Sequence, residues 1–230
     1  MTVIRGARER ARIEVTQAIK DEARRQLAAE GAARLSLRAI SRELGMVSSA
    51  LYRYFPSRDD LLTELIIDAY DALGAEGERA LTAETGDATA RWTAVCEAVR
   101  AWALAHPHEY ALIYGSPVPG YTAPEATIGP ASRVGLALLS IVRDTHRSGQ
   151  LALTPLVAVA RPEAERMATA LADDLPPEAV AALVAAWAQL SGLVSFELFG
   201  QFHNVVEDRD AFFAQAARRL AYEAGLRTTA

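Results

Sequence analysis

Apolar residues recur at helical spacing along most of the chain, beginning near the N-terminus. Every fourth position from Val15 to Leu27 is apolar, which predicts an amphipathic helix over about residues 9–30. Gly31 follows directly, and glycine is a typical stop signal for a helix. The chain is therefore expected to open with a long helix that has one apolar face.

Two short helices and a tight turn are predicted next. Ser36 is placed to cap a helix that ends at Gly45, and a second short helix follows over about residues 47–54. The sequence Ser57-Arg-Asp-Asp60 resembles a capping box that opens a longer helix. A long helix followed by two short ones joined by a tight turn predicts a helix-turn-helix unit.

The remaining chain also has helical patterning, interrupted by loops that carry proline and glycine. No series of strands is indicated, so the expected fold class is all-α, with an N-terminal three-helix head and a C-terminal helical domain. The boundary is expected between residues 1–57 and 58–230. Helices are expected near residues 88–105, 128–147, 163–172, 177–200 and 208–224.

The segment 177–200 is apolar on two faces. A seam of small residues occupies one face, and larger apolar residues occupy the other. We expect the chain's own domain to cover one face and a second copy of the chain to cover the other; a central core helix within a monomer is the alternative. The predicted dimer interface comprises Ala181, Ala185, Ala188, Gly192 and Ser195, with Phe212, Phe213 and Leu220 from the last helix.

Composition is that of an ordinary globular protein, with 51% hydrophobic and 23% charged residues. The uncharged stretch 179–196 is the nearest approach to a membrane span, but Gln189 and Gly192 interrupt it, so a buried helix is expected and no membrane partner. The single cysteine, Cys96, and the absence of a signal-peptide pattern point to the cytoplasm.

Charge is distributed unevenly along the chain. Residues 1–58 contain 12 Lys and Arg against 6 Asp and Glu, whereas residues 59–230 contain 12 against 23. A basic head on an acidic body is the electrostatic pattern expected of a protein that binds a phosphate backbone, although chance in a charged surface gives the same pattern. A helix of about eight residues is about 12 Å long and fits the major groove of DNA. Its expected outward positions are Val47, Ser48, Ser49, Tyr52, Arg53 and Tyr54.

The stretch SLRAISRELGMVSSALYRYFPSRDDLL resembles the DNA-binding head of TetR-family transcriptional regulators. Gly45, Leu51, Tyr52, Phe55 and Arg58 fall in register with that family's pattern. The resemblance implies that Tyr52, Tyr54 and Arg58 contact phosphates, with half-buried packing as the alternative for each tyrosine. It also implies that Ser36 caps a helix near the DNA backbone and that Arg38 reads a base.

Two positions depart from the family's pattern. Tyr54 stands where histidine is common, which keeps a hydrogen-bond donor but removes any charge. Val47 stands where a capping serine is common, which puts the cap of the recognition helix in doubt. An exposed valine at this position could touch a thymine methyl group; a half-buried valine is the alternative.

The resemblance further implies a homodimer that binds a palindromic operator in double-stranded DNA, acts as a repressor and is released by a small-molecule effector of unknown identity. It places the effector pocket among the middle helices of the C-terminal domain. The aromatic residues able to line it are Trp92, Trp102, Tyr110, Tyr114, Trp187 and Phe196, with His146 or Glu197 as polar members. Taken alone, each is explained more simply as plain core.

An enzyme has little support in the sequence. His106-Pro-His108-Glu109 could offer metal ligands, but neither a CxxC nor an HExxH pattern accompanies it. No catalytic residue, metal or cofactor is therefore expected. The alternative function is a helical enzyme or binding protein that acts on a small apolar ligand in the C-terminal pocket, whereas an adaptor that binds only protein would leave the basic head unexplained.

Overall fold

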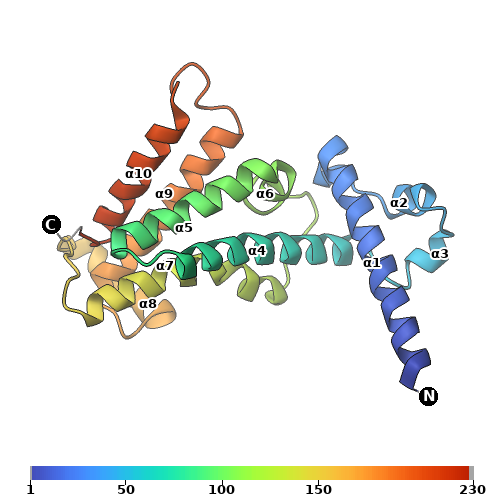
Figure 1. The fold of residues 1–230 in the computed structure, drawn as a ribbon, viewed down its shortest axis with the longest axis horizontal. Coiled ribbons are helices and arrows are strands. Elements are labelled where there is room, and N and C mark those ends of the chain that lie inside the picture. Colours follow the sequence, from blue (N-terminus) through green and yellow to red (C-terminus); the bar gives the residue numbers. More distant parts are fainter. Residues whose placement is uncertain (1, 228–230) are drawn as a thin grey trace. The chain divides into compact units, whose positions relative to one another are not determined.

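The computed structural model describes residues 2–227, which contain α-helices and short 3₁₀ helices and no strand (Figure 1). The predicted all-α fold class is confirmed. The helices are α1 (Thr2–Glu30), α2 (Leu37–Glu43), α3 (Ser48–Leu51), α4 (Arg58–Ala83), α5 (Ala88–Ala105), α6 (Pro107–Tyr114), α7 (Ile128–Arg147), α8 (Arg161–Leu171), α9 (Pro177–Leu198) and α10 (Arg209–Glu223), with 3₁₀ helices η1 (Ala32–Arg34), η2 (Glu125–Thr127) and η3 (Ala158–Ala160).

The chain divides into two compact units. The first contains the chain up to Tyr70 together with His106–Ile128, and the second contains Asp71–Ala105 and the chain from Gly129 onward. The long helix α4 therefore contributes residues to both. Compactness does not test the predicted functional boundary at residue 57, which stays a prediction.

In the first unit, α1 ends at Glu30 as predicted but begins at Thr2, earlier than the sequence pattern indicates. Gly31 follows with φ of 79°, a left-handed conformation that glycine adopts without strain. The predicted apolar face is confirmed, since Ile19, Ala23 and Leu27 are buried. They pack with residues of α2, α3 and α4 in one hydrophobic core.

The helix-turn-helix follows the predicted plan with one shorter element. Ser36 caps α2, because its side chain accepts a hydrogen bond from the Ala39 N–H at 3.4 Å. Gly45 forms the turn with φ of 63°. Helix α3 ends at Leu51 rather than near Tyr54, and a turn continues the chain toward Phe55. After Leu51 the hydrogen bonds tighten to three-residue spacing, with the Tyr54 N–H donating to the Leu51 carbonyl at 2.8 Å, so a 3₁₀-type turn replaces the last predicted turn of α-helix.

Helix α6 and the loop after it are part of the first unit, which the sequence pattern did not predict. Leu112, Val118 and Tyr121 pack against the head's core. The Tyr121 hydroxyl lies 2.9 Å from the Thr63 hydroxyl, and the Tyr70 hydroxyl donates to the Ile113 carbonyl at 3.3 Å. The core of the head therefore includes a segment far from it in sequence.

In the second unit, the predicted limits of α5 and α7 are confirmed, and α8, α9 and α10 lie within two residues of prediction. Helices α4 and α7 approach closely at Gly74, where an added Cβ would lie 2.6 Å from the Cβ of Arg133. Arg133 also pairs with Glu78 at 2.6 Å, and this hydrogen bond lowers the pKa of Glu78 below its ordinary value. A small residue and an ion pair thus hold this contact together.

Helix α9 is buried along one face and exposed along the other, although most of its residues are apolar. Val180, Leu183, Leu190 and Val194 are buried, whereas Ala185 and Ala188 on the small-residue seam are exposed. Among the described residues it is the one helix long and apolar enough to cross a membrane; core helices of globular proteins pass the same test. Within this chain, one face of α9 is covered and the other is open.

Candidate nucleic-acid interface

Helix α3 places its apolar anchor inward and its small and aromatic side chains outward. Leu51 is fully buried in the head's core. Ser49 and Arg53 are exposed, and Tyr52 is 41% exposed. Of the expected outward positions on α3 and on the turns at its two ends, all are exposed except Tyr54, which is half-buried.

Val47 is 70% exposed at the N-cap position of α3, so the half-buried alternative is wrong. Its side chain makes no capping hydrogen bond. The neighbouring Ser48 hydroxyl instead lies 3.1 Å from the hydroxyl of buried Ser41, which donates to the Arg38 carbonyl at 3.0 Å. This pair of hydroxyls joins the start of α3 to α2.

The two tyrosines differ in their surroundings. Tyr54 is half-buried and packs against the head's core, as the packing alternative expects, whereas Tyr52 projects into solvent. A phenol that packs along its ring can still present its hydroxyl to a partner. Contacts of either hydroxyl with phosphate stay predictions.

Two groups of cations in the first unit differ in their partners. Lys20 and Arg24 are neutralised within the unit: Lys20 pairs with Glu64 at 2.9 Å and Asp68 at 3.0 Å, and Arg24 pairs with Asp68 and Glu109. Burial alone lowers the pKa of Lys20, but the hydrogen bonds to its two carboxylates outweigh burial, so the pKa is raised. The ion pairs of these two cations join α1 to α4 and α6.

The second group of cations surrounds α2 and α3. None of its members forms an ion pair with a carboxylate among the described residues. They are exposed and retain their full charge toward solvent: Arg34, Arg38, Arg42 and Arg53. Arg34 and Arg42 were not among the predicted DNA contacts, although the four-residue spacing of Arg38 and Arg42 places both on one face of α2.

Arg58 has a structural partner. Its guanidinium donates to the Ala32 carbonyl at 2.8 Å and the Ala33 carbonyl at 3.4 Å, and lies 3.6 Å from Asp59. It therefore ties the start of α4 to η1. The Ser57 hydroxyl accepts from the Asp60 N–H at 3.1 Å, which confirms the predicted cap of α4.

The aromatic residues predicted to line an effector pocket are distributed over both units. Tyr110 and Tyr114 belong to the first unit and the others to the second. Trp92 and Trp102 are buried in the core, His146 is exposed, and Trp187 and Phe196 are 37% and 53% exposed on α9. The indole N–H of Trp92 is buried without a hydrogen-bond acceptor. Glu197, the alternative polar member, is bound to Arg100 at 2.7 Å.

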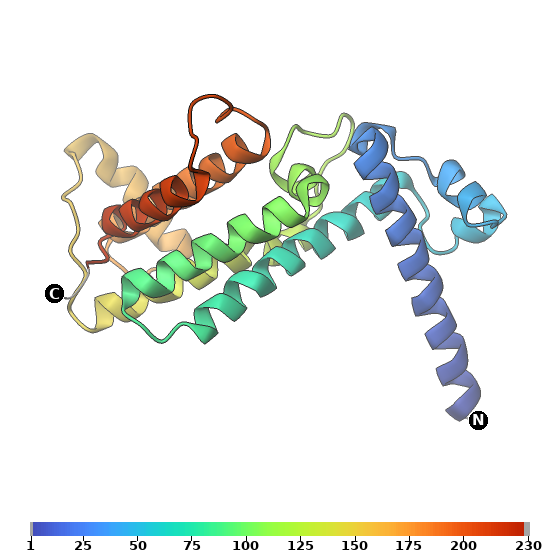
Figure 2. The same ribbon diagram turned by 45° about the horizontal axis from the view of Figure 1, so that its top comes forward.

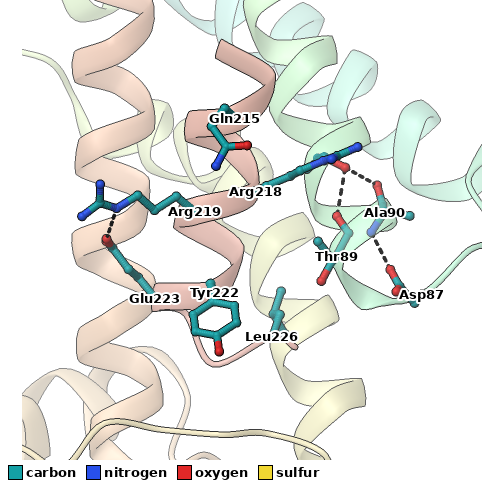
Figure 3. A pocket seen from close by; sticks show the side chains of 10 residues that line it. Asp87, Thr89, Ala90, Gln215, Arg218, Arg219, Tyr222, Glu223 and Leu226 are labelled. Carbon is teal, nitrogen blue, oxygen red and sulfur yellow. Dashed lines mark hydrogen bonds and ion pairs between the residues drawn. The ribbon is translucent and has the colours of Figure 1, made fainter. Parts of the chain in front are cut away.

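Among the grooves that the described part of the second unit forms, two flank the length of α10. One has a volume of about 680 Å³ and lies between α5 and α10, where the side chains of Thr89, Arg218 and Tyr222 line it (Figure 3). The other has a volume of about 450 Å³, lies between α9 and α10, and includes Phe196 and Phe212. No sequence pattern predicts the first groove, because its polar residues come from α5 and α10, which are far apart in the sequence.

The predicted dimer surface is open in its small and aromatic parts. Ala181, Gly192 and Ser195 are half-buried. Phe212 is 42% exposed, and the Phe202 ring stacks edge to face on it and on Phe196, with centroids 5.4 Å and 5.8 Å apart. Phe213 and Leu220 are buried within the unit itself. Of the three residues predicted on the last helix, Phe212 is therefore the one whose side chain is exposed.

The described residues contain no cluster of three or more His, Cys, Asp or Glu able to hold a metal ion. Glu109 of the His-Pro-His-Glu stretch pairs with Arg24 at 3.3 Å. Cys96 is fully buried, and burial raises the pKa of its thiol well above the ordinary value. The thiol is therefore protonated and inaccessible at neutral pH.

Two family descriptions match the sequence. Residues 19–65 match "Bacterial regulatory proteins, tetR family", and residues 92–220 match "Tetracyclin repressor-like, C-terminal domain". The chain is also 41% identical over 223 residues to the HTH-type transcriptional regulators Rv1816 of Mycobacterium tuberculosis and Mb1846 of Mycobacterium bovis, with 94% of each chain covered.

Solved structures give the same grouping. The regulatory protein SCO4313 is 34% identical, with a TM-score of 0.77 over 92% of this chain and 97% of that one. A TetR-family regulator from Shewanella, 19% identical, shares the fold with a TM-score of 0.61 over 93% and 98%. The family and the curated relatives are regulators of transcription, not enzymes. The chain belongs to the TetR family of bacterial transcriptional regulators and carries that family's helix-turn-helix DNA-binding domain.

Proposed function

We propose that this protein is a cytoplasmic, homodimeric, ligand-responsive repressor that binds a palindromic operator in double-stranded DNA and is released by a small-molecule effector. The observation that carries the proposal is the set of arginines around α2 and α3 without carboxylate partners. Four exposed cations beside a short helix with small outward side chains suit a duplex, whose backbone is a dense line of negative charge.

Within the head, each side chain has a role suited to its chemistry. Arg38 reads a base edge, since a guanidinium can bond two guanine acceptors at once. Ser48 and Ser49 allow close approach of α3 to the bases. Ser36 holds the start of α2 near the backbone. Tyr52, Arg53, Tyr54 and Arg58 contact phosphates. Arg58 does so through the guanidinium N–H groups that do not bind the carbonyls of η1.

In this proposal, residues 1–57 bind DNA, and residues 58–230 bind the effector and form the dimer. The open face of α9 and the exposed Phe212 support dimerisation through α9 and α10, since exposed aromatic and small residues together favour a closely packed contact. A two-fold dimer presents two α3 helices to half-sites about 34 Å apart or a related spacing, so the operator is a palindrome.

Effector control follows from linkage. A ligand that prefers a conformation with unsuitable head spacing lowers DNA affinity by the same factor by which DNA lowers ligand affinity. Buried Trp92 supports a pocket in the C-terminal region, because its unpaired indole N–H is a donor that a ligand acceptor would satisfy. The other residues predicted to line an effector pocket stay predictions.

Transcription in vitro tests the repressor claim. A promoter that carries the bound palindrome should produce less transcript as the protein is added, and sedimentation of the complex should give two chains per palindrome. Increased transcription would mean an activator, and one chain per palindrome would contradict the dimer.

Val47 should read a thymine methyl group. Replacing the contacted thymine by deoxyuridine removes one methyl, worth about 0.8 kcal/mol, and should weaken binding of the native protein about fourfold. Val47→Ala should bind the two DNAs equally, and so should Val47→Ser, although serine can restore a cap to α3. Equal losses in all three proteins at every thymine would contradict this role.

A further inference from the structure

Residues 6–14, in the N-terminal half of α1, are helical but make no tertiary packing. Every side chain from Gly6 to Glu14 is exposed, including Ile13 at 60%. Packing against the head begins at Val15. Figures 1 and 2 both show this half of the helix extending beyond α2 and α3. We call residues 6–14 the arm.

Two arginines of the arm continue the face of α1 that packs on the head. Arg8 and Arg12 are four residues apart, and Arg12 precedes buried Ile19 by seven, so all three lie on one side of the helix. With a rise of about 1.5 Å per residue, Arg12 lies about 10 Å and Arg8 about 16 Å beyond Ile19 along the axis. Both side chains therefore leave α1 on the side where α2 and α3 lie, past the edge of the head.

The charges of these two arginines have no partner among the side chains that the structure describes. Neither forms an ion pair or hydrogen bond with another described side chain, whereas Arg10, on the opposite side, donates to the Gly6 carbonyl at 3.2 Å. Like charges four residues apart on a helix destabilise it slightly. An isolated helical segment this short is marginal in water, so an anionic partner would both neutralise the pair and stabilise the arm.

We propose that Arg8 and Arg12 bind backbone phosphates of the duplex flanking each half-site, so that the arm is a second DNA contact beside α3. The inference rests on the proposed function, because α3 must first place the head on DNA. Phosphates are the anions expected at this place, since a duplex extends past the head on both sides of any site that α3 reads. Such contacts add affinity without adding base specificity.

The experiment compares Arg8→Gln/Arg12→Gln with the native protein on a selected operator, as salt is varied. The slope of log affinity against log salt should fall by about 0.9 for each lost phosphate contact, hence by about 1.8 per bound chain. Arg10→Gln is the matched control: it removes the same charge from the opposite face of the arm and should leave the slope unchanged. Thermal unfolding of all three proteins should coincide, because the replaced side chains are exposed.

A second readout is the length of the duplex. Trimming the flanks to the outermost base pairs of the palindrome should weaken the native protein and the Arg10→Gln control, and leave the double variant unaffected. Specific binding with equal slopes and equal sensitivity to trimming in all three proteins would overturn this inference alone. Absence of specific DNA binding by the native protein would overturn it together with the proposed function.

Discussion

Replacing Arg38 and Arg53 together by alanine is expected to lower operator affinity by about 10²–10⁴-fold. Each side chain is exposed and has no carboxylate partner in the described chain, so its whole charge is available to DNA. The base contact proposed for Arg38 is worth about 1–3 kcal/mol, and the charged phosphate contact proposed for Arg53 is worth about 1.5–3 kcal/mol. Each 1.4 kcal/mol is about tenfold in affinity. Fluorescence anisotropy of a labelled operator measures the loss.

The control for this pair is Arg147→Ala, which removes an exposed arginine from the end of α7 in the second unit. It should leave operator affinity within about twofold, since exposed charges farther apart than about 10 Å are largely screened in ordinary salt. An unchanged affinity in the Arg38/Arg53 variant would remove these arginines from the interface. Arg58 is a poor choice for the same test, because its bonds to Ala32 and Ala33 make it structural as well.

Arg100→Ala is expected to destabilise the second unit by about 3–5 kcal/mol. Arg100 joins α5 to α9 through two hydrogen bonds of 2.7 Å to buried Glu197 and reaches Asp210 of α10 at 2.7 Å. Its guanidinium also lies 5.1 Å from the centre of the Phe213 ring. Removing the arginine leaves the carboxylate of Glu197 buried without its cation, which is the costly way to break such a pair.

Denaturant unfolding followed by tryptophan fluorescence isolates this effect, because Trp92, Trp102 and Trp187 all belong to the second unit. Arg143→Ala, which breaks the exposed pair with Asp174, should change stability little. The double variant Arg100→Leu/Glu197→Leu should recover much of the loss, since apolar replacement of both partners leaves no buried charge. A destabilisation no larger than that of Arg143→Ala would contradict this account of Arg100.

The head was largely predictable because its signals are local. Ser36 and Gly45 mark the start and end of α2 by capping and by a positive φ, both properties of single residues. The predicted α3 is longer than the observed one because apolar spacing continues to Phe55, and spacing does not distinguish an α-helix from the 3₁₀-type turn that follows Leu51.

Long-range features were not predictable from patterning. Helix α6 lies in a stretch with two histidines and two aromatic residues and no clear apolar stripe, and its place beside α1 depends on contacts such as Arg24 with Glu109, 85 residues apart. Glu197 was expected as a pocket residue, but its partner Arg100 lies 97 positions away. Spacing along one helix cannot identify a partner on another.

The structure of the first unit bears on the proposed effector control. Segment His106–Ile128 shares the head's compact unit through Leu112 and Tyr121 although it lies beyond the predicted domain boundary. A movement of α6 would act on α1 directly, through the pair formed by Glu109 and Arg24. Allosteric coupling needs such a physically continuous element with two arrangements.

The most direct test of the central claim is binding of the native protein to DNA from its own upstream region and to a random-sequence pool, followed across salt concentrations. We predict tight binding to one palindrome, with log affinity falling linearly with log salt by about 0.9 for each phosphate neutralised. Failure to bind the upstream DNA above nonspecific background, together with no enriched sequence from the random pool, would contradict the assignment of α2 and α3 as a sequence-specific DNA reader.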